Sequence, residues 1–154
     1  MTVAGVDVST RQIDVVVLDT RTGRATWHPW RLPAGDLIHR IASIRDWPAD
    51  SLLAGCSAVG IERPYGRHGA WQASMAAGAT VTRLPAVPMR WWSPAEWRRA
   101  CGLPGNASKL DVLWWASSQG CPSDWSQDAA DAYCIAYATS YSYVTVSVTA
   151  EADG

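Results

Sequence analysis

The chain has 154 residues, of which 48% are hydrophobic and 18% are charged. It is long enough to bury the core of one ordinary domain, and its composition excludes the disordered and fibrous classes. An uncharged, mostly apolar stretch covers residues 52–61, about half of the ~20 residues that a membrane span needs. Asp7 and Arg11 precede any signal-peptide core, so we expect a cytoplasmic protein without membrane contact.

Apolar runs separated by turn residues predict five strands. The first three follow one another closely and favour an antiparallel meander, and the fourth ends in a charge and a proline, as is typical of a buried strand. Two prolines then argue against regular structure from Pro85 to about Ser93. The expected strands are residues 3–8, 13–18, 25–30, 58–62 and 79–84.

Apolar residues at helical spacing, together with capping residues, predict five helices. Ser93, Pro94 and Glu96 are an N-cap, a first-turn proline and a reciprocal capping residue, so one helix begins there. The others are expected over 34–46, over 69–77, from Asn106 or Ser108 to about Gly120, and from Asp124 or Ser126 to about Tyr141.

This order of elements predicts an α/β fold, in which a mixed five-stranded sheet has helices on both faces. We expect one domain over residues 1–143 and a tail of uncertain structure over 144–154. The ten tryptophans, in a chain without phenylalanine, are expected to fill the core for the most part. The four cysteines lack the spacing of a zinc knuckle or redox dithiol, which favours buried free thiols.

Opposite charges are concentrated in different parts of the chain. Residues 63–109 carry a net charge of +6, residues 110–154 carry −6, and residues 1–62 carry −1. Cations that attract phosphate, beside carboxylates that hold metal ions, are what a metal-dependent nuclease needs. A neutral globular protein can show the same distribution by chance.

Four acidic residues stand out by position. Asp7 interrupts the most apolar predicted strand, and Glu62 ends the other buried strand. Asp128 and Asp131 are three residues apart and share one face of the last helix. If strands 3–8 and 58–62 are parallel neighbours, the four carboxylates can meet. Ligands that are all oxygen favour Mg²⁺ or Mn²⁺, and two such ions can hold a phosphate and activate water.

Each of these acids also has a purely structural interpretation. Asp7 could cap a turn with Ser9, and Glu62 could pair with Arg63 or Arg67. The acidic pair on the last helix could stabilise a helix N-terminus. We favour the joint site because all four positions are occupied together. Five other acids at element ends are expected to be solvated: Asp14, Asp19, Asp36, Asp46 and Asp50.

Four segments, in this order and at approximately this spacing, resemble the RuvC-type Holliday junction resolvases. They are Gly-Val-Asp-Val-Ser at 5–9, Val-Gly-Ile-Glu at 59–62, Gly-Asn-Ala-Ser-Lys at 105–109 and Asp-Ala-Ala-Asp-Ala at 128–132. The resemblance covers nearly the whole chain. It implies a ribonuclease H-like fold, a homodimer that acts on four-way DNA junctions, and Mg²⁺ or Mn²⁺ held at four acidic positions. By match, these are Asp7, Glu62, Asp128 and Asp131.

The resemblance also implies residues that contact DNA. Lys109, the only lysine, matches the family lysine near the scissile phosphate. Arg98 follows an apolar residue as a basic residue does in the family, so it is a phosphate contact or, alternatively, a solvated helix charge. The family pairs through the helix that we expect over 69–77, whose small residues permit close helix approach.

A loop after the fourth predicted strand carries the remaining DNA-binding candidates. Tyr65 lies three residues after Glu62, where resolvases carry an aromatic residue that stacks on an unpaired base at the junction. Arg63 and Arg67 flank it. The competing interpretation is a simple turn with an exposed tyrosine.

One departure from the family is clear. Cellular resolvases usually have Asp-Pro-Gly where this chain has Asp7-Val8-Ser9. This places the chain in a divergent branch, such as the short versions carried by bacteriophages, for which the host cytoplasm is the expected location. Branch-specific properties, above all the preferred cleavage sequence, do not transfer.

Three other functions fit part of the pattern. An actin-like or sugar-kinase ATPase shares the opening strand but needs a second domain, and the absence of Gly-x-x-x-x-Gly-Lys-Ser/Thr argues against a nucleotide cofactor. A ribonuclease of the same fold would process structured RNA. A catalytically silent module would bind branched DNA without cutting it. The intact acidic set favours a metal-dependent, structure-selective endonuclease that resolves four-way or other branched DNA.

Overall fold

The computed structural model describes residues 1–65 and 70–152. Five strands form one mixed sheet in the order β3-β2-β1-β4-β5. β1 pairs antiparallel with β2, and β2 with β3, whereas β4 lies parallel to both β1 and β5. The strands are β1 (Thr2–Val8), β2 (Gln12–Asp19), β3 (Ala25–Arg31), β4 (Ala58–Glu62) and β5 (Met89–Trp92).

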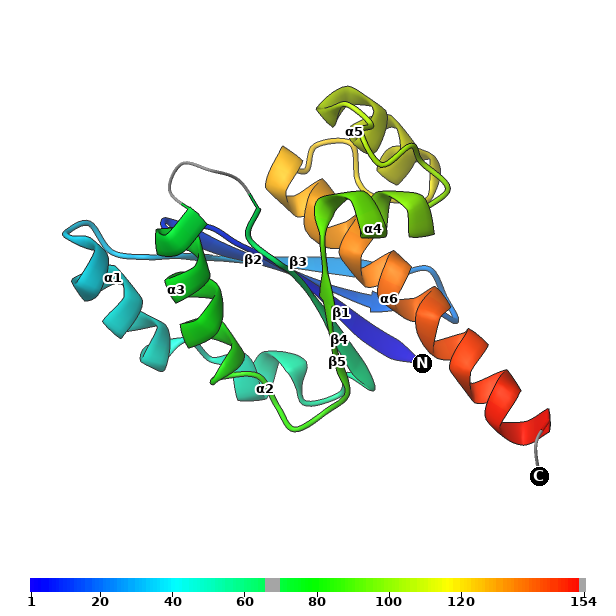
Figure 1. Cartoon of the computed structure of the whole chain (residues 1–154), viewed down its shortest axis with the longest axis horizontal. Helices are drawn as coiled ribbons and strands as arrows, with labels where there is room; N and C mark the ends of the chain where they lie inside the picture. The colour runs from blue at the N-terminus through cyan, green and yellow to red at the C-terminus, as the bar shows by residue number, and fades with distance from the viewer. Residues whose placement is uncertain (66–69, 153–154) are drawn as a thin grey trace.

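Helices cover both faces of the sheet, as predicted (Figure 1). One face is packed against α4, α5 and α6, and the other against α1, α2 and α3. Each face therefore has its own buried apolar cluster. The helices are α1 (Leu37–Ser43), α2 (Ala49–Leu53), α3 (Ala70–Val81), α4 (Pro94–Ala100), α5 (Lys109–Ser118) and α6 (Gln127–Ala152).

The predicted strand over 79–84 is wrong, because α3 continues through Val81. Thr80, a β-branched residue that favoured the strand, is buried in the helix and donates its hydroxyl to the Ala76 carbonyl at 2.8 Å. The fifth strand lies instead at Met89–Trp92, inside the segment predicted to be irregular. Pro88 is compatible with this strand because the Pro88 carbonyl accepts the Val59 amide at 3.0 Å and no N–H is needed there.

The N-termini of the later helices follow the predicted capping residues. Ser93 and Glu96 form a complete capping box for α4, and Ser108 with Asp111 does the same for α5. The helix predicted over 34–46 is shorter, because Asp36 caps α1 and a 3-10 turn covers Ile44–Asp46. None of the described helices combines the length and apolar character that crossing a bilayer requires.

The close approach of α6 to β1 depends on glycine. A Cβ atom on Gly5 would overlap the Ala132 carbonyl oxygen and the Ala136 amide nitrogen. Ala132 and Ala136 are fully buried, so the backbone of α6 lies directly against the backbone of β1. The first turns of α6 are thereby held beside the carboxyl end of β1. The helix ends at Ala152 rather than near Tyr141, and it takes up most of the predicted tail.

Candidate active site

Asp7 and Glu62 end neighbouring parallel strands. The β1–β4 register pairs Val6 with Ile61, so Asp7 and Glu62 are the next residues along each strand. Both side chains are half-buried. A Glu62 carboxylate oxygen accepts a 2.7 Å hydrogen bond from the Trp97 indole, which fixes this carboxylate against α4. The predicted parallel arrangement of these strands is confirmed.

Asp128 and Asp131 lie in the first two turns of α6. Between and after them, Ala129, Ala130 and Ala132 are buried against the sheet and its neighbouring helices, so the acidic pair is anchored by apolar residues. Asp128 is exposed and Asp131 is half-buried. We call Asp7, Glu62, Asp128 and Asp131 the acidic cluster.

The members of the acidic cluster influence one another electrostatically. Burial, followed by the charges of Glu62, Asp131 and Asp128, raises the pKa of Asp7 well above its usual value of 3.8. Burial also raises the pKa of Glu62, with a smaller contribution from the charge of Asp131. The pKa of Asp131 rises to about 6, chiefly through burial. Carboxylates that repel one another in a half-buried place gain from a cation between them.

The donor chemistry of the acidic cluster fits a hard divalent cation, because all its ligand atoms are carboxylate oxygens. Within residues 1–65 and 70–152, no group of three or more histidine, cysteine, aspartate or glutamate side chains has the arrangement of a closed metal site. The carboxylates would therefore have to turn toward one another to share an ion.

Asp14 was expected to be solvated, and this expectation is wrong. Asp14 is 2% exposed and lies directly opposite Asp7 in the β1–β2 register. The Gln12 amide donates to both of its oxygens at 2.9 Å, and the Trp27 indole donates at 2.8 Å. Burial raises its pKa although these hydrogen bonds oppose the shift. Asp14 therefore adds a fifth carboxylate beside the acidic cluster.

The sequence does contain a signal for the position of Asp14. A tight turn in which Ser9 bonds to Gln12 closes the β1–β2 hairpin. Counting outward from this turn pairs Val8 with Ile13 and then Asp7 with Asp14. Ser9 bonds to Gln12 and Arg11 rather than to Asp7, so these contacts lend no support to Asp7 as a cap for the turn.

Two cations lie near the acidic cluster. The positive charges of Arg98 and Lys109 both lower the pKa of Asp131, and that of Arg98 also lowers the pKa of Glu62. The Arg98 guanidinium lies 4.9 Å from the centre of the Trp97 ring and donates to the Gly105 carbonyl at 3.3 Å. Its Nε is buried without a hydrogen-bond partner in the described part of the chain.

The loop after β4 is described only in part. Arg63 pairs with Glu96 at 3.5 Å, and not with Glu62. Tyr65 is 86% exposed, as a side chain that stacks on a base must be. Arg67 lies outside the described residues. The structural alternative in which Glu62 pairs with Arg63 is therefore wrong, and Glu62 instead accepts a hydrogen bond from the Trp97 indole.

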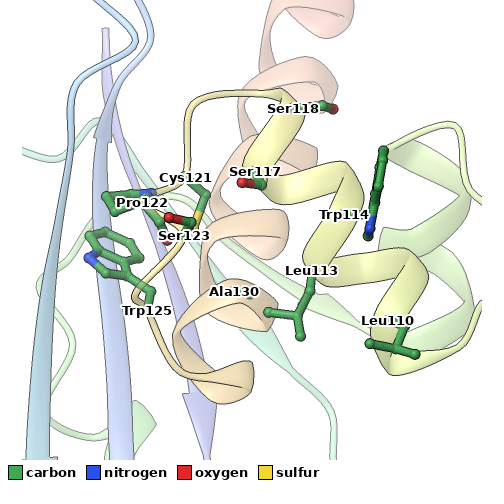
Figure 2. A pocket seen from close by; sticks show the side chains of 10 residues that line it. All are labelled: Leu110, Leu113, Trp114, Ser117, Ser118, Cys121, Pro122, Ser123, Trp125 and Ala130. Atoms are coloured by element: carbon green, nitrogen blue, oxygen red, sulfur yellow. Dashed lines mark hydrogen bonds between the residues drawn. The ribbon is translucent and has the colours of Figure 1, made fainter.

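An apolar hollow of about 520 Å³ is lined by none of the four members of the acidic cluster (Figure 2). It runs between α5 and the loop that leads into α6, with Leu110 and Leu113 on one side and Trp125 on the other. Ala130 lines the hollow from α6, between Asp128 and Asp131 in sequence. Among the described residues no acid lines the hollow, and its mostly apolar lining does not suit a hard divalent cation.

The fold is ribonuclease H-like, and it matches solved structures of this class over nearly its whole length. The Thermus thermophilus RuvC structure has a TM-score of 0.76 and 20% sequence identity, and the match covers 94% of this chain and 96% of that one. T. thermophilus RuvC in complex with Holliday junction substrate has a TM-score of 0.74 and 19% identity over the same shares. No protein-family model and no curated protein matches the sequence. At this identity the likeness shows a common fold.

Proposed function

We propose that the chain is a metal-dependent endonuclease of the RuvC type that cuts four-way (Holliday) junctions or other branched DNA. The observation that carries this proposal is the acidic cluster, in which β1, β4 and α6 bring four carboxylates to one end of the sheet. The fold around the cluster is one shared with RuvC over 94% of the chain. Position, charge and fold therefore support the same function.

The acidic cluster would hold two Mg²⁺ or Mn²⁺ ions. Bound ions supply Lewis acidity at the scissile phosphate and activate water for in-line attack. Asp7 and Glu62, on the two rigid central strands, would fix the position of the ions. Asp128 and Asp131 would complete the ligand set from α6. The raised pKa values of Asp7, Glu62 and Asp131 support this assignment, because a bound cation offsets the repulsion that contributes to the shifts of Asp7 and Glu62.

Arg98 and Lys109 would hold the phosphate that is cut. Both act electrostatically on Asp131, so they lie close enough to place a phosphate against the acidic cluster. Lys109 begins α5 and is exposed. These two residues would act as binding groups, whereas the carboxylates would act through the ions.

The loop after β4 would recognise the branch point. Tyr65 is exposed and therefore free to stack on an unpaired base, a contact worth about 1–3 kcal/mol per base in single-strand binders. Arg63 and Arg67 would contact phosphates on either side of that base. Arg63 lies next to Glu62, so the loop begins at the acidic cluster.

A homodimer would place two acidic clusters on one junction. We assign the dimer contact to α3, where Trp71 and Met75 lie one turn apart and are 63% and 40% exposed. The RuvC-type family pairs through the corresponding helix, and exposed apolar side chains on it are available for a contact between two copies. Trp71→Glu should give a monomer by light scattering. Trp114→Glu should leave the dimer intact, although it changes a tryptophan on α5 that is 81% exposed.

The test of the proposed function is cleavage of a strand-labelled four-way junction beside linear duplex, flap and RNA–DNA hybrid, in Mg²⁺ or Mn²⁺. We expect paired cuts in opposing arms of the junction and none with Asp7→Asn. Preference for the flap or hybrid would change the substrate while keeping the nuclease. Metal-independent binding of all substrates without any cut would overturn the catalytic assignment.

A further inference from the structure

A second hollow, of about 320 Å³, lies at the β5 edge of the sheet, between β5, α4 and α6. Arg90 lines it from β5, and Glu96 and Arg99 line it from α4. Neither arginine belongs to the residues assigned above. The two cations come from different elements, and only the pairing of β5 with β4 and the packing of α4 bring them to one place. We call Arg63, Arg90 and Arg99, with Glu96 among them, the arginine edge.

The position of Arg90 is fixed by packing. Its guanidinium carbon lies 3.7 Å from the centre of the Trp92 ring. Trp92 is buried, and its indole donates to the Thr139 hydroxyl of α6 at 3.0 Å. A guanidinium stacked on an aromatic ring keeps its N–H donors in its own plane, where they remain available to an anion. Arg90 is exposed, so a large ligand can reach these donors.

The arginine edge has more positive than negative charge. Among the described residues, no ion pair holds Arg90 or Arg99, whereas Arg63 pairs with Glu96 at 3.5 Å. Among the described residues, Glu96 is the only acid that lines the hollow, and its carboxylate already accepts the Ser93 amide at 2.7 Å. The charges of Arg63 and Arg90 both act on Glu96, so one acid faces three arginines, and a polyanion is the ligand that this surface complements.

The arginine edge is continuous with the acidic cluster. Trp92, which lines the hollow, is the register partner of Glu62 on β4. Arg63 follows Glu62, and its amide donates to the Trp92 carbonyl at 2.7 Å. A DNA backbone that passes the acidic cluster can therefore continue across β5 onto α4, where Glu96 is the acid that it meets.

We infer that Arg90 and Arg99 bind the phosphodiester backbone of a duplex arm that leads away from the cutting point. The inference rests on the proposed function, because it takes branched DNA as the ligand. An exposed surface with two arginines, one of them stacked on an aromatic ring, suits a regular polyanion. Neither arginine touches the reacting phosphate in this arrangement, so their contribution is to binding and not to the chemical step.

The test measures binding of fluorescent four-way junctions by anisotropy without added divalent metal, so that no cutting occurs. Junctions with arms of about half a helical turn are compared with junctions whose arms span about two turns. For the long-armed junction, Arg90→Ala and Arg99→Ala should each weaken binding about tenfold. Each should also reduce the slope of log affinity against log salt by about 1. The affinity for the short-armed junction should fall less in both variants.

Arg24→Ala is the matched control, because Arg24 is also exposed but lies in the turn between β2 and β3, at the opposite end of the sheet from Asp7. It should change neither affinity nor salt slope. Arg90→Lys and Arg99→Lys keep the charge but lose the planar donor group, and they should give intermediate affinities.

An unchanged affinity and salt slope in the Arg90→Ala/Arg99→Ala double variant would overturn the inference. Equal losses for short and long arms would also overturn it, since the arginines would then act at the branch point. If the wild-type protein cuts no DNA in Mg²⁺ or Mn²⁺ but the double variant still loses long-arm binding, the proposed function fails and the binding surface stands. The two ideas therefore fail in different measurements.

Discussion

The acidic cluster and the arginine edge adjoin one another but are built in opposite ways. Three of the four carboxylates are half-buried, and burial is the largest cause of the raised pKa of Asp7, Glu62 and Asp131. Arg90 and Arg99, in contrast, are exposed cations whose hydration is largely kept. The acidic cluster therefore lowers the stability of the metal-free protein, whereas the arginine edge has little effect on it.

This difference separates what each region contributes. Removing a charge from the acidic cluster should stabilise the metal-free protein and abolish cutting. Removing a positive charge from the arginine edge should leave the free energy of unfolding unchanged and weaken DNA binding. A variant that breaks either half of this comparison would show that the two regions are not separate in function.

The largest effect is expected from Glu62→Gln, because one ligand of the ions is lost while the shape and the hydrogen bond from Trp97 can be kept. We expect junction cutting in Mg²⁺ to fall by about 10²–10³-fold, which corresponds to the several kcal/mol that metal ions supply. Binding of uncut junction should fall less than threefold. Single-turnover cleavage and anisotropy measure the two effects separately.

Glu96→Gln is the matched change on the arginine edge. Glutamine can replace glutamate in the capping box of α4, so the fold should persist. Loss of the only acid that lines the hollow should leave cutting unchanged at saturating enzyme and tighten binding. If Glu62→Gln and Glu96→Gln lowered cutting equally, the distinction between the two regions would be lost.

The next largest effect concerns the support of the acidic cluster. A Cβ atom in Gly5→Ala would overlap backbone atoms of Ala132 and Ala136, which can only be relieved by moving α6 away from β1. We expect a loss of about 3 kcal/mol in the free energy of unfolding. Cutting should fall further than the loss of folded protein explains, because Asp128 and Asp131 move with α6.

Gly78→Ala is the control for Gly5→Ala. A Cβ atom at Gly78, inside α3, would meet nothing within 4 Å, so alanine should stabilise the helix by up to about 1 kcal/mol. Urea unfolding measures both variants. A Gly5→Ala protein as stable and as active as the wild type would mean that α6 does not need to lie against β1.

Local sequence determines some parts of this molecule and not others. The caps of α4 and α5 and the hairpin strands were predicted because their signals lie within a few residues. The segment over 79–84 has three consecutive β-branched residues, but α3 continues through Val81 with Thr80 buried, and a turn follows. Tertiary packing therefore decided a choice that local propensity left open.

The candidate site divides in the same way. The common edge for Asp7 and Glu62 could be predicted, because parallel strands place their carboxyl ends together. The burial of Asp14 follows from the register of the β1–β2 hairpin, and the prediction of a solvated Asp14 did not use that register. The meeting of Arg90 with Arg99 could not be predicted, because it needs the fifth strand at Met89–Trp92, a segment that two neighbouring prolines made appear irregular.

The stability cost of the acidic cluster can be measured with Asp131→Asn in metal-free buffer. The folded-state pKa of Asp131 is about 6, above its usual 3.8, so the folded state binds more protons than the unfolded state between these values. Stability from this group is present below about pH 4 and is lost as the pH rises through 6. Asparagine should therefore raise the free energy of unfolding by about 1–3 kcal/mol at pH 7.

Thermal melts at pH 4 and pH 7 with chelator check this expectation. The gain in melting temperature at pH 7 should be about 2–8 °C, and it should nearly vanish at pH 4. Asp124→Asn, which changes an exposed acid just before α6, should give no gain at either pH. An equal gain for Asp131→Asn at both pH values would assign the effect to packing rather than to charge.

The smallest effect is expected at Asp14. This residue lies opposite Asp7, but its charge contributes least among the causes that raise the pKa of Asp7. Asp14→Asn removes a buried charge and can keep the hydrogen bond from the Trp27 indole. The negative potential that attracts a divalent ion then falls, so the Mn²⁺ concentration for half-maximal thermal stabilisation should rise about 2–5-fold.

Trp27→Phe separates charge from structure at this position. It removes the donor to Asp14 and leaves the carboxylate in place. The free energy of unfolding should fall by about 1–3 kcal/mol, because a buried acceptor loses a partner, while the half-maximal Mn²⁺ concentration should not rise. If Asp14→Asn and Trp27→Phe shifted the Mn²⁺ dependence equally, Asp14 would act by holding β3 against β2, and the acidic cluster would end at the four carboxylates named above.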